Sequence, residues 1–133
     1  MPDPIQKITL SRYATQRLAA HPGLAAEVDA ARDARTSFSA AEIARALQGA
    51  RSDDEAAFKR RLRLLRQRVL LRTMARDLAG EVSSPENLAE VCRTTSDLAE
   101  SSIHAALEWL GDADLIVVAM GKLGGREMTA ASD

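Results

Sequence analysis

The sequence predicts a mainly α fold that leads, near its C-terminal end, into one strand and a glycine-rich turn. Aromatic residues make up only 3% of the 133-residue chain and apolar residues 46%, so the core must consist mostly of Leu, Ala and Val, which suits packed helices. Helix caps and terminating glycines recur before residue 112, whereas LIVVAM at residues 115–120 has no helical periodicity. We therefore expect a helical region over residues 1–111 and the start of an α/β domain over residues 112–133.

The first three predicted helices are short. A weakly amphipathic segment over residues 5–20 ends at the helix-breaking sequence HPG, residues 21–23. A second helix is expected over residues 24–34. SAAE at residues 39–42 has the spacing of a capping box, in which serine and glutamate side chains accept backbone N–H groups at a helix start. It should open a third helix that stops at Gly49.

A long arginine-rich helix is expected next. SDDE at residues 52–55 is a second candidate capping box and puts three carboxylates in the first turn, where the helix dipole favours negative charge. The helix should extend to about residue 79, with Gly80 as its C-terminal cap. Its apolar stripe, at helical spacing, consists of Phe58, Leu62, Leu65 and Val69, widened by Leu64, Leu71 and Leu78.

The basic residues of this helix allow two interpretations. Eight of the chain's 18 Lys and Arg residues lie within residues 58–76, on both sides of the apolar stripe. They could contact nucleic acid or an acidic partner. Alternatively, this is a core helix whose arginines are solvated or paired with Glu and Asp on neighbouring helices. We favour the second, because the basic residues form no separate face and the net charge is −1, and we do not expect a nucleic-acid partner.

The last predicted helix contains the only tryptophan of the chain. SSPEN at residues 83–87 puts its proline at the first helical position, where the missing N–H has no intrahelical partner to lose. We expect an interruption near residues 94–95 and termination at Gly111. Trp109 and Leu110 should pack against the strand that follows.

The apolar run at residues 115–120 has the pattern of a strand buried on both faces. A strand without neighbours leaves its N–H and C=O groups unpaired, which costs about 1–3 kcal/mol for each buried group. We therefore expect the chain to be a fragment or a gene product cut short, with the partner strands elsewhere. An unpaired apolar edge also predicts poor solubility or self-association.

The strand runs into GKLGGRE, residues 121–127. Glycines let backbone N–H groups approach an anion closely, so a phosphate cradle is one interpretation and a tight strand-to-helix turn the other. The spacing fits neither a P-loop nor a G-x-G-x-x-G fingerprint. Asp133 follows shortly afterwards as a candidate Mg²⁺ ligand, although one carboxylate cannot hold the ion. By itself it would be an exposed terminal residue.

Other classes of site find little support in the sequence. The single cysteine, Cys92, leaves no intrachain disulfide and favours a reducing compartment. His21 and His104 lack the spacing of zinc ligands, and no serine or cysteine nucleophile has a supporting base. Neither a signal peptide nor an apolar run of membrane-spanning length is evident. We expect a cytoplasmic protein with no membrane partner.

The C-terminal region resembles a known family. VVAMGKLGGREMTAASD, residues 117–133, resembles the nucleotidyltransferase signature of the glutamine synthetase adenylyltransferase/adenylyl-removing enzymes, also called glutamate-ammonia-ligase adenylyltransferases. The helical segments at residues 61–80 and 96–110 are similar to those that precede this signature. The resemblance covers residues 58–133, whereas residues 1–50 match only in helical character.

This resemblance implies a DNA-polymerase-β-like nucleotidyltransferase domain, of which the chain holds only the first strand and glycine turn. Full-length members carry two such domains. The N-terminal one removes AMP from a tyrosine of glutamine synthetase by phosphorolysis, giving ADP, and the C-terminal one adds AMP from ATP. A regulator of the PII type sets the balance. Because GGRE looks more like the first repeat and follows about 120 residues of helical lead-in, the resemblance implies the adenylyl-removing half.

The resemblance also implies roles for single residues. It gives phosphate or nucleotide binding to five residues of the turn: Gly121, Lys122, Gly124, Gly125 and Arg126. Asp133 matches the first aspartate of an Asp-x-Asp pair that holds Mg²⁺, and is thereby implied as catalytic residue and metal ligand. The second aspartate and a later acidic residue are not in the sequence, so we expect no activity from the chain alone. A helical module that binds an acidic partner or nucleic acid, and a remnant without function, stay open as alternatives.

Overall fold

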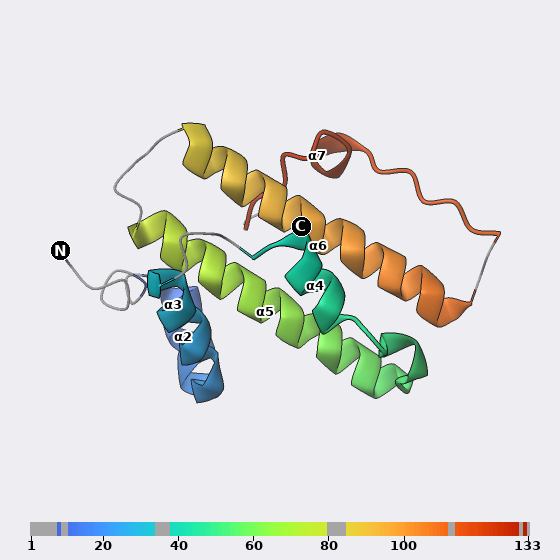
Figure 1. Ribbon diagram of the computed structural model, residues 1–133, viewed down its shortest axis with the longest axis horizontal. Coiled ribbons are helices and arrows are strands. Elements are labelled where there is room, and N and C mark those ends of the chain that lie inside the picture. Colours follow the sequence, from blue (N-terminus) through green and yellow to red (C-terminus); the bar gives the residue numbers. More distant parts are fainter. Residues whose placement is uncertain are drawn as a thin grey trace.

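The helical architecture is the main feature of the computed structural model, which describes residues 8, 11–33, 38–79, 85–111, 114–130 and 132. Within these ranges the chain is mainly helical and contains no β-strand (Figure 1). The α-helices are α2 (Arg12–Ala20), α3 (Ala25–Asp33), α4 (Ala40–Ala46), α5 (Glu55–Ala79), α6 (Pro85–Leu110) and α7 (Gly121–Gly124); the 3₁₀ turns are η1 (Pro22–Leu24) and η2 (Ala50–Ser52). The mainly α prediction is thereby confirmed.

Helix α5 is the centre of the fold. It runs antiparallel to α6 along the long axis of the molecule, with α3 against it on another side and α4 against α6 (Figure 1). Phe58, Leu65 and Val69 of α5 join one apolar cluster with side chains of α4 and α6. Leu71 and Ala75 join a second cluster, with side chains of η1 and α3 among others. Because α5 is covered on more than one side, its apolar residues do not form a single stripe.

The predicted widening of that stripe is only partly correct. Leu71 is fully buried, but Leu64 is 49% exposed and Leu78 36% exposed. The three residues share one face because seven residues are nearly two helical turns. The second cluster covers this face only around Leu71, so the prediction is wrong for the other two.

The first capping box is confirmed and the second is wrong. Ser39 Oγ accepts the Glu42 N–H at 3.2 Å, and the Glu42 carboxylate accepts the Ser39 N–H at 2.8 Å. At α5 the cap is Asp54, whose Oδ1 accepts the Ala57 N–H at 2.7 Å. Ser52 cannot serve, because it already belongs to the 3₁₀ turn η2. The helix therefore begins two residues later than the SDDE spacing suggested.

Helix α6 begins at Pro85 as predicted, and Gly111 follows its last residue with a φ of 67°. The predicted interruption near residues 94–95 is wrong, since the helix is continuous there. Both threonines are buried in the continuous helix. The Thr95 hydroxyl donates to the Val91 carbonyl at 2.8 Å, one turn back, whereas the Thr94 hydroxyl has no hydrogen-bond partner among the described residues.

Trp109 does not pack against a strand, contrary to the prediction. Its ring stacks on Phe58 with centroids 5.1 Å apart, and its Nε1–H donates to the Asp53 carbonyl at 2.8 Å. It therefore joins the end of α6 to the start of α5. Leu110 is 60% exposed and takes no part in this contact.

The predicted buried strand at residues 115–120 is also wrong as a description of this structure. The segment forms no strand, and Ile116, Val118 and Met120 are each more than 70% exposed. The physical reason is that no second strand exists among the described residues to pair with it. Figure 1 shows it as an extended link between α6 and α7. Two predicted sites, Gly80 and Asp133, lie outside the described residues, and no helix within those residues is long and apolar enough to cross a bilayer.

Candidate functional site

The glycine turn consists of a single turn of helix, α7, which follows the extended segment. The N–H of Gly124 donates to the Met120 carbonyl at 3.3 Å, and that of Gly125 donates to Gly121 at 2.9 Å. Both amides are therefore used inside the turn. The N–H groups that open α7, at residues 121–123, have no intrahelical acceptor, as at any helix start. If an anion binds the backbone here, these are the groups that can receive it.

Two glycines of the turn are required by geometry, and a third is not. A Cβ at Gly124 would lie 2.7 Å from the Ala119 carbonyl oxygen, closer than real contacts allow. Gly121 has a φ of 59°, a left-handed conformation that side chains disfavour. A Cβ at Gly125 would find its nearest neighbour at 3.5 Å, an ordinary contact. The close approach of the turn to the extended segment therefore depends on Gly124.

The turn ends in a Schellman motif with an arginine in the usual glycine position. The N–H of Glu127 donates to the Lys122 carbonyl at 2.7 Å, and that of Arg126 donates to Leu123 at 3.1 Å. Arg126 has a φ of 56° and is the one non-glycine residue with a positive φ in the part of the chain that the structure describes. Glycine adopts this conformation without penalty, and arginine does not.

The Arg126 side chain reaches α6 rather than the start of α7. Its guanidinium forms ion pairs with Asp97 and with Glu100, the latter at 2.8 Å. Hydrogen bonds from the Arg126 guanidinium to Asp97 first, and then to Glu100, raise the pKa of the arginine above its ordinary value. Sequence reasoning missed both carboxylates. Their spacing puts them on one face of a helix, but nothing local links that face to residue 126.

The other two predicted site residues are Lys122 and Asp133. Lys122 is exposed, and its side chain has no partner among the described residues. Asp133 falls outside those residues, and within them no group of three His, Cys, Asp or Glu side chains could hold a metal ion. The described part of the chain thus does not by itself form a Mg²⁺ site.

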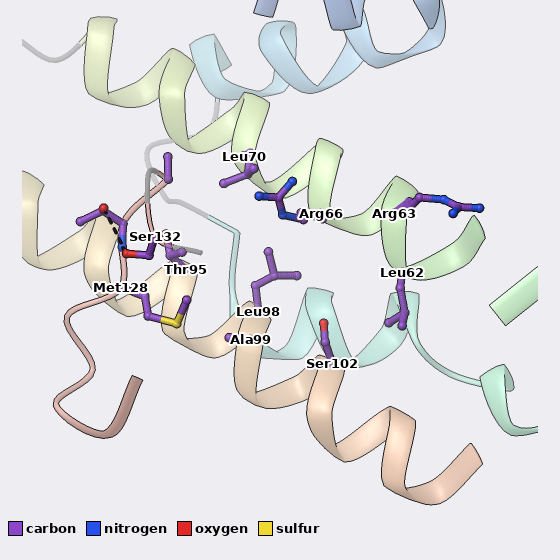
Figure 2. Close-up of a pocket in the computed structure, with 12 residues that line it drawn as sticks. Leu62, Arg63, Arg66, Leu70, Thr95, Leu98, Ala99, Ser102, Met128 and Ser132 are labelled. Carbon is purple, nitrogen blue, oxygen red and sulfur yellow. Dashed lines mark hydrogen bonds between the residues drawn. The ribbon is translucent and has the colours of Figure 1, made fainter. Parts of the chain in front are cut away.

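Two cavities adjoin the turn and the segment after it. One, of about 440 Å³, separates α6 from the turn and is lined by Ile103, Leu107 and Leu123 among others. The second, of about 300 Å³, lies between α5, α6 and residues 128–130 and 132, and Figure 2 shows the residues that line it. Arg63 and Arg66 line it and form no ion pair within the described ranges. The other polar residues that line it are Thr95, Ser102, Thr129 and Ser132.

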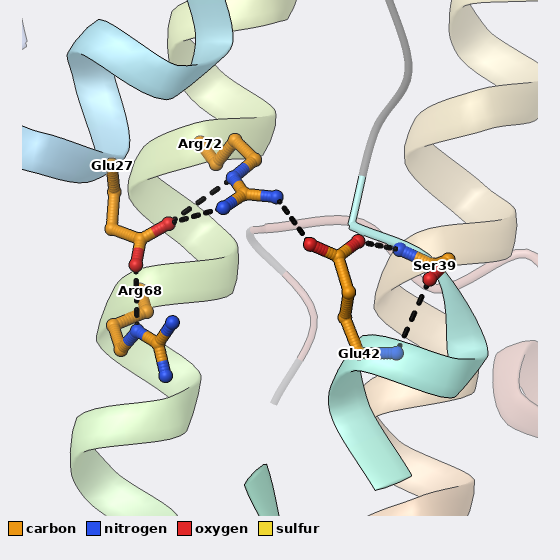
Figure 3. Close-up of polar contacts among 5 residues, drawn as sticks. All are labelled: Glu27, Ser39, Glu42, Arg68 and Arg72. Atoms are coloured by element: carbon orange, nitrogen blue, oxygen red, sulfur yellow. Dashed lines mark hydrogen bonds and ion pairs between the residues drawn. The ribbon is translucent and has the colours of Figure 1, made fainter. Parts of the chain in front are cut away.

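Four of the seven arginines of α5 are paired with carboxylates, as the favoured interpretation expected. Arg72 donates to Glu27 at 2.8 Å and to Glu42 at 3.1 Å, and Arg68 donates to Glu27 at 2.6 Å (Figure 3). Two further pairs are Arg61–Asp53 and Arg76–Glu90. These contacts tie α3, α4 and α6 to α5. Four of these seven arginines therefore serve the fold, and the other three, Arg60, Arg63 and Arg66, form no ion pair within the described ranges.

Comparisons with known proteins give a consistent result. A model of the glutamate-ammonia ligase adenylyltransferase family matches residues 5–133. The chain is similar to proteins named bifunctional glutamine synthetase adenylyltransferase/adenylyl-removing enzyme. The relative from Thioalkalivibrio sulfidiphilus is 41% identical over 110 residues, which is 71% of this chain and 11% of that protein. The relative from Nitrosomonas europaea is 38% identical over 144 aligned positions, 92% of this chain and 15% of that protein.

A third relative, from Ralstonia nicotianae, is 33% identical over 145 aligned positions, which is 95% of this chain and 15% of that protein. The chain thus spans between 11% and 15% of the length of these three relatives. No solved structure matches it.

Proposed function

The chain belongs to the glutamate-ammonia ligase adenylyltransferase family, and from this we propose that it is part of the adenylyl-removing half of a bifunctional enzyme acting on glutamine synthetase. The observation that carries the proposal is the family match over residues 5–133, which includes the glycine turn. The likeness of GGRE to the first of the family's two signatures supports the adenylyl-removing half.

The proposed reaction is phosphorolysis of an adenylylated tyrosine. An oxygen of inorganic phosphate forms a bond to the phosphorus of the AMP group while the bond from that phosphorus to the tyrosine oxygen breaks. The products are ADP and the tyrosine, whose oxygen takes up a proton. In the other half of such an enzyme, AMP would pass from ATP to the same tyrosine. Catalysis of this kind depends on positioning the phosphate and neutralising its charge.

The turn would contribute the positioning. The open N–H groups at residues 121–123 and the Lys122 ammonium are suited to phosphate oxygens, because these donors have no acceptor among the described residues and residues 121 and 122 are exposed. Gly124 allows the turn to lie against the extended segment. Gly121 and Gly125 belong to the same proposed phosphate-binding set.

Mg²⁺ enters the proposal only through the resemblance of Asp133 to the first metal-binding aspartate of the family. When bound, Mg²⁺ would neutralise phosphate charge. In this proposal Asp133 would supply one carboxylate to the ion, and the turn would hold phosphate. We further propose that the chain does not catalyse the reaction alone, consistent with its small share of the relatives' length.

The proposed partners follow from the same family. They are glutamine synthetase as the macromolecular substrate, a PII-type regulatory protein, phosphate with ADP in the removing half, and ATP in the adding half. All are partners expected of a cytoplasmic enzyme of nitrogen regulation.

A chimera tests which half the chain serves. The segment of the Nitrosomonas europaea relative that matches this chain would be replaced by residues 1–133, and AMP removal and AMP addition would be assayed separately. We expect the chimera to release ADP from adenylylated glutamine synthetase in the presence of phosphate. Gly124→Ala in the chimera should reduce removal and leave addition intact, and Gly23→Ala, outside the turn at a glycine whose added Cβ would meet no atom within 4 Å, is the control.

If Gly124→Ala in the chimera abolished AMP addition and left AMP removal intact, that result would contradict the assignment to the adenylyl-removing half. The purified chain alone, given adenylylated glutamine synthetase and phosphate, should release no ADP. Detectable ADP in that assay would refute the proposed inactivity.

A further inference from the structure

We infer that Asp97 and Glu100 of α6 are positioning residues for the glycine turn and act on it through Arg126. Because it deepens the role of that turn, the inference rests on the proposed function. It gives Arg126 an indirect part in phosphate binding, in which the side chain holds the turn while the backbone N–H groups and Lys122 face the anion.

The backbone at Arg126 is the first argument. The residue occupies the left-handed position of a Schellman motif, where glycine is the usual choice. Local geometry therefore gives no reason for an arginine, and it disfavours any side chain there. We infer that the left-handed conformation is maintained because the Arg126 side chain forms ion pairs with two carboxylates of α6.

The arrangement of the carboxylates is the second argument. Asp97 and Glu100 are three residues apart and so project from one face of α6. The single guanidinium donates to both of them. Asp97 is only 18% exposed, so at least one of the pairs is partly shielded from solvent. Neither carboxylate is shared with any arginine of α5.

The surroundings of the turn are the third argument. A cavity of about 440 Å³ lies between the turn and α6, with Glu100 and Arg126 among the residues that line it. Close packing of apolar side chains therefore does not fill this junction. The ion pairs span it, and they fix the C-terminal end of a helix only four residues long. Fixing that end also fixes where the N–H groups at residues 121–123 point.

Phosphate titration of the ¹⁵N-labelled chain, followed by NMR of the turn amides, tests the inference. The variants are Arg126→Met, Arg126→Gly, the double change Asp97→Asn with Glu100→Gln, and all three changes Arg126→Met, Asp97→Asn and Glu100→Gln together. Glu86→Gln, an exposed α6 glutamate outside the contact, is the control. We expect Arg126→Met and the double change each to weaken phosphate binding by a similar factor, about threefold to tenfold, with no further loss when combined. Arg126→Gly should weaken it as well, although it relieves the backbone.

Two results would overturn the inference. If the double change on α6 leaves phosphate affinity unchanged or tightens it while Arg126→Met weakens it, Arg126 is itself the phosphate ligand. If Arg126→Gly binds phosphate like the wild-type chain, the ion pairs do not position the turn.

Absence of phosphate binding by the wild-type chain would count against the proposed function, and a second measurement then decides the inference. Amide hydrogen exchange at Gly125 and Glu127, which donate within the turn, should be at least about threefold faster in Arg126→Met and in the α6 double change, at unchanged Tm. Unchanged exchange at these amides would also overturn it.

Discussion

At the scale of single residues, neighbouring glycines of the turn have different requirements. A Cβ added at Gly124 would lie 2.7 Å from the Ala119 carbonyl oxygen. A Cβ added at Gly125 would have its nearest neighbour at 3.5 Å, which is an ordinary contact. The backbone carbonyl cannot rotate away as a flexible side chain would, so the turn itself must shift.

We predict that Gly124→Ala displaces the turn and Gly125→Ala does not. NMR chemical shifts of the Met120 and Gly121 amides should change widely in the first variant and little in the second. The global Tm should stay close to wild type in both, because the turn lies outside the two apolar clusters. Equal shift changes in the two variants would show that the close approach is not decisive.

The start of α5 gives a second residue-scale prediction. Asp54, rather than Ser52, accepts an N–H of the first turn. Asp54→Ala should therefore lower the free energy of unfolding by about 0.5–2 kcal/mol, the usual range for an N-cap. Ser52→Ala serves as the control and should have little effect. Urea unfolding at neutral pH measures both, and a larger loss for Ser52→Ala would favour the original SDDE interpretation.

At the scale of elements, ion pairs connect helices that are far apart in sequence. Glu27 of α3 is largely buried and accepts from both Arg68 and Arg72, and Arg72 also donates to Glu42 of α4. Removing one partner of a buried pair leaves the other charge unpaired, which is costly even where the intact pair contributes little net stability. The network thus specifies how α3 and α4 dock on α5.

This network predicts an acid limb in stability. Burial raises the pKa of Glu42, but hydrogen bonds from the Ser39 N–H and from Arg72 outweigh it, so the pKa lies below the ordinary value of 4.5. A hydrogen bond from Arg61 lowers the pKa of Asp53 below 3.8. Since the unfolded chain binds these protons more readily, stability is present above the unfolded pKa values and is lost as pH falls through the folded ones.

We therefore expect the free energy of unfolding to be nearly constant between about pH 7 and pH 5, and to fall below about pH 4.5. Glu42→Gln should make the acid limb shallower. Urea titrations across this range measure the effect. An identical acid limb in wild type and variant would mean that Glu42 does not contribute to it.

At the scale of the whole molecule, residues 115–120 form an exposed apolar segment. Residues 115–120 lie outside the helical core, with Ile116 and Val118 among the most exposed apolar residues described. Contiguous exposed apolar surface of this kind is prone to association.

We predict that the chain self-associates through this segment. Sedimentation velocity should show association that increases with concentration, and Ile116→Lys with Val118→Lys should reduce it, because charges on an extended edge oppose pairing. Leu64→Lys, at an exposed apolar position on α5, is the control. A monomer at all concentrations, or an equal response to the control, would contradict the prediction.

Local sequence determined most helix boundaries, because a cap depends on residues within one turn. The Ser39–Glu42 box, the proline that opens α6 and the glycine after it were all predictable in this way. The same reasoning failed at α5, where the spacing alone could not distinguish Asp54 from Ser52 as the cap. It also failed at residues 94–95, where both threonines are buried in a continuous helix.

By itself the sequence determined the mainly helical class, the family and the position of the glycine turn, since these depend on local spacing and on a contiguous motif. Only the tertiary structure decided that Trp109 stacks on Phe58, that residues 115–120 form no buried strand, and that Arg126 turns to Asp97 and Glu100. Each of these outcomes depends on which distant groups are present to pack, pair or hydrogen-bond. Sequence periodicity describes a residue's own element, and it carries no information about the partner across the fold.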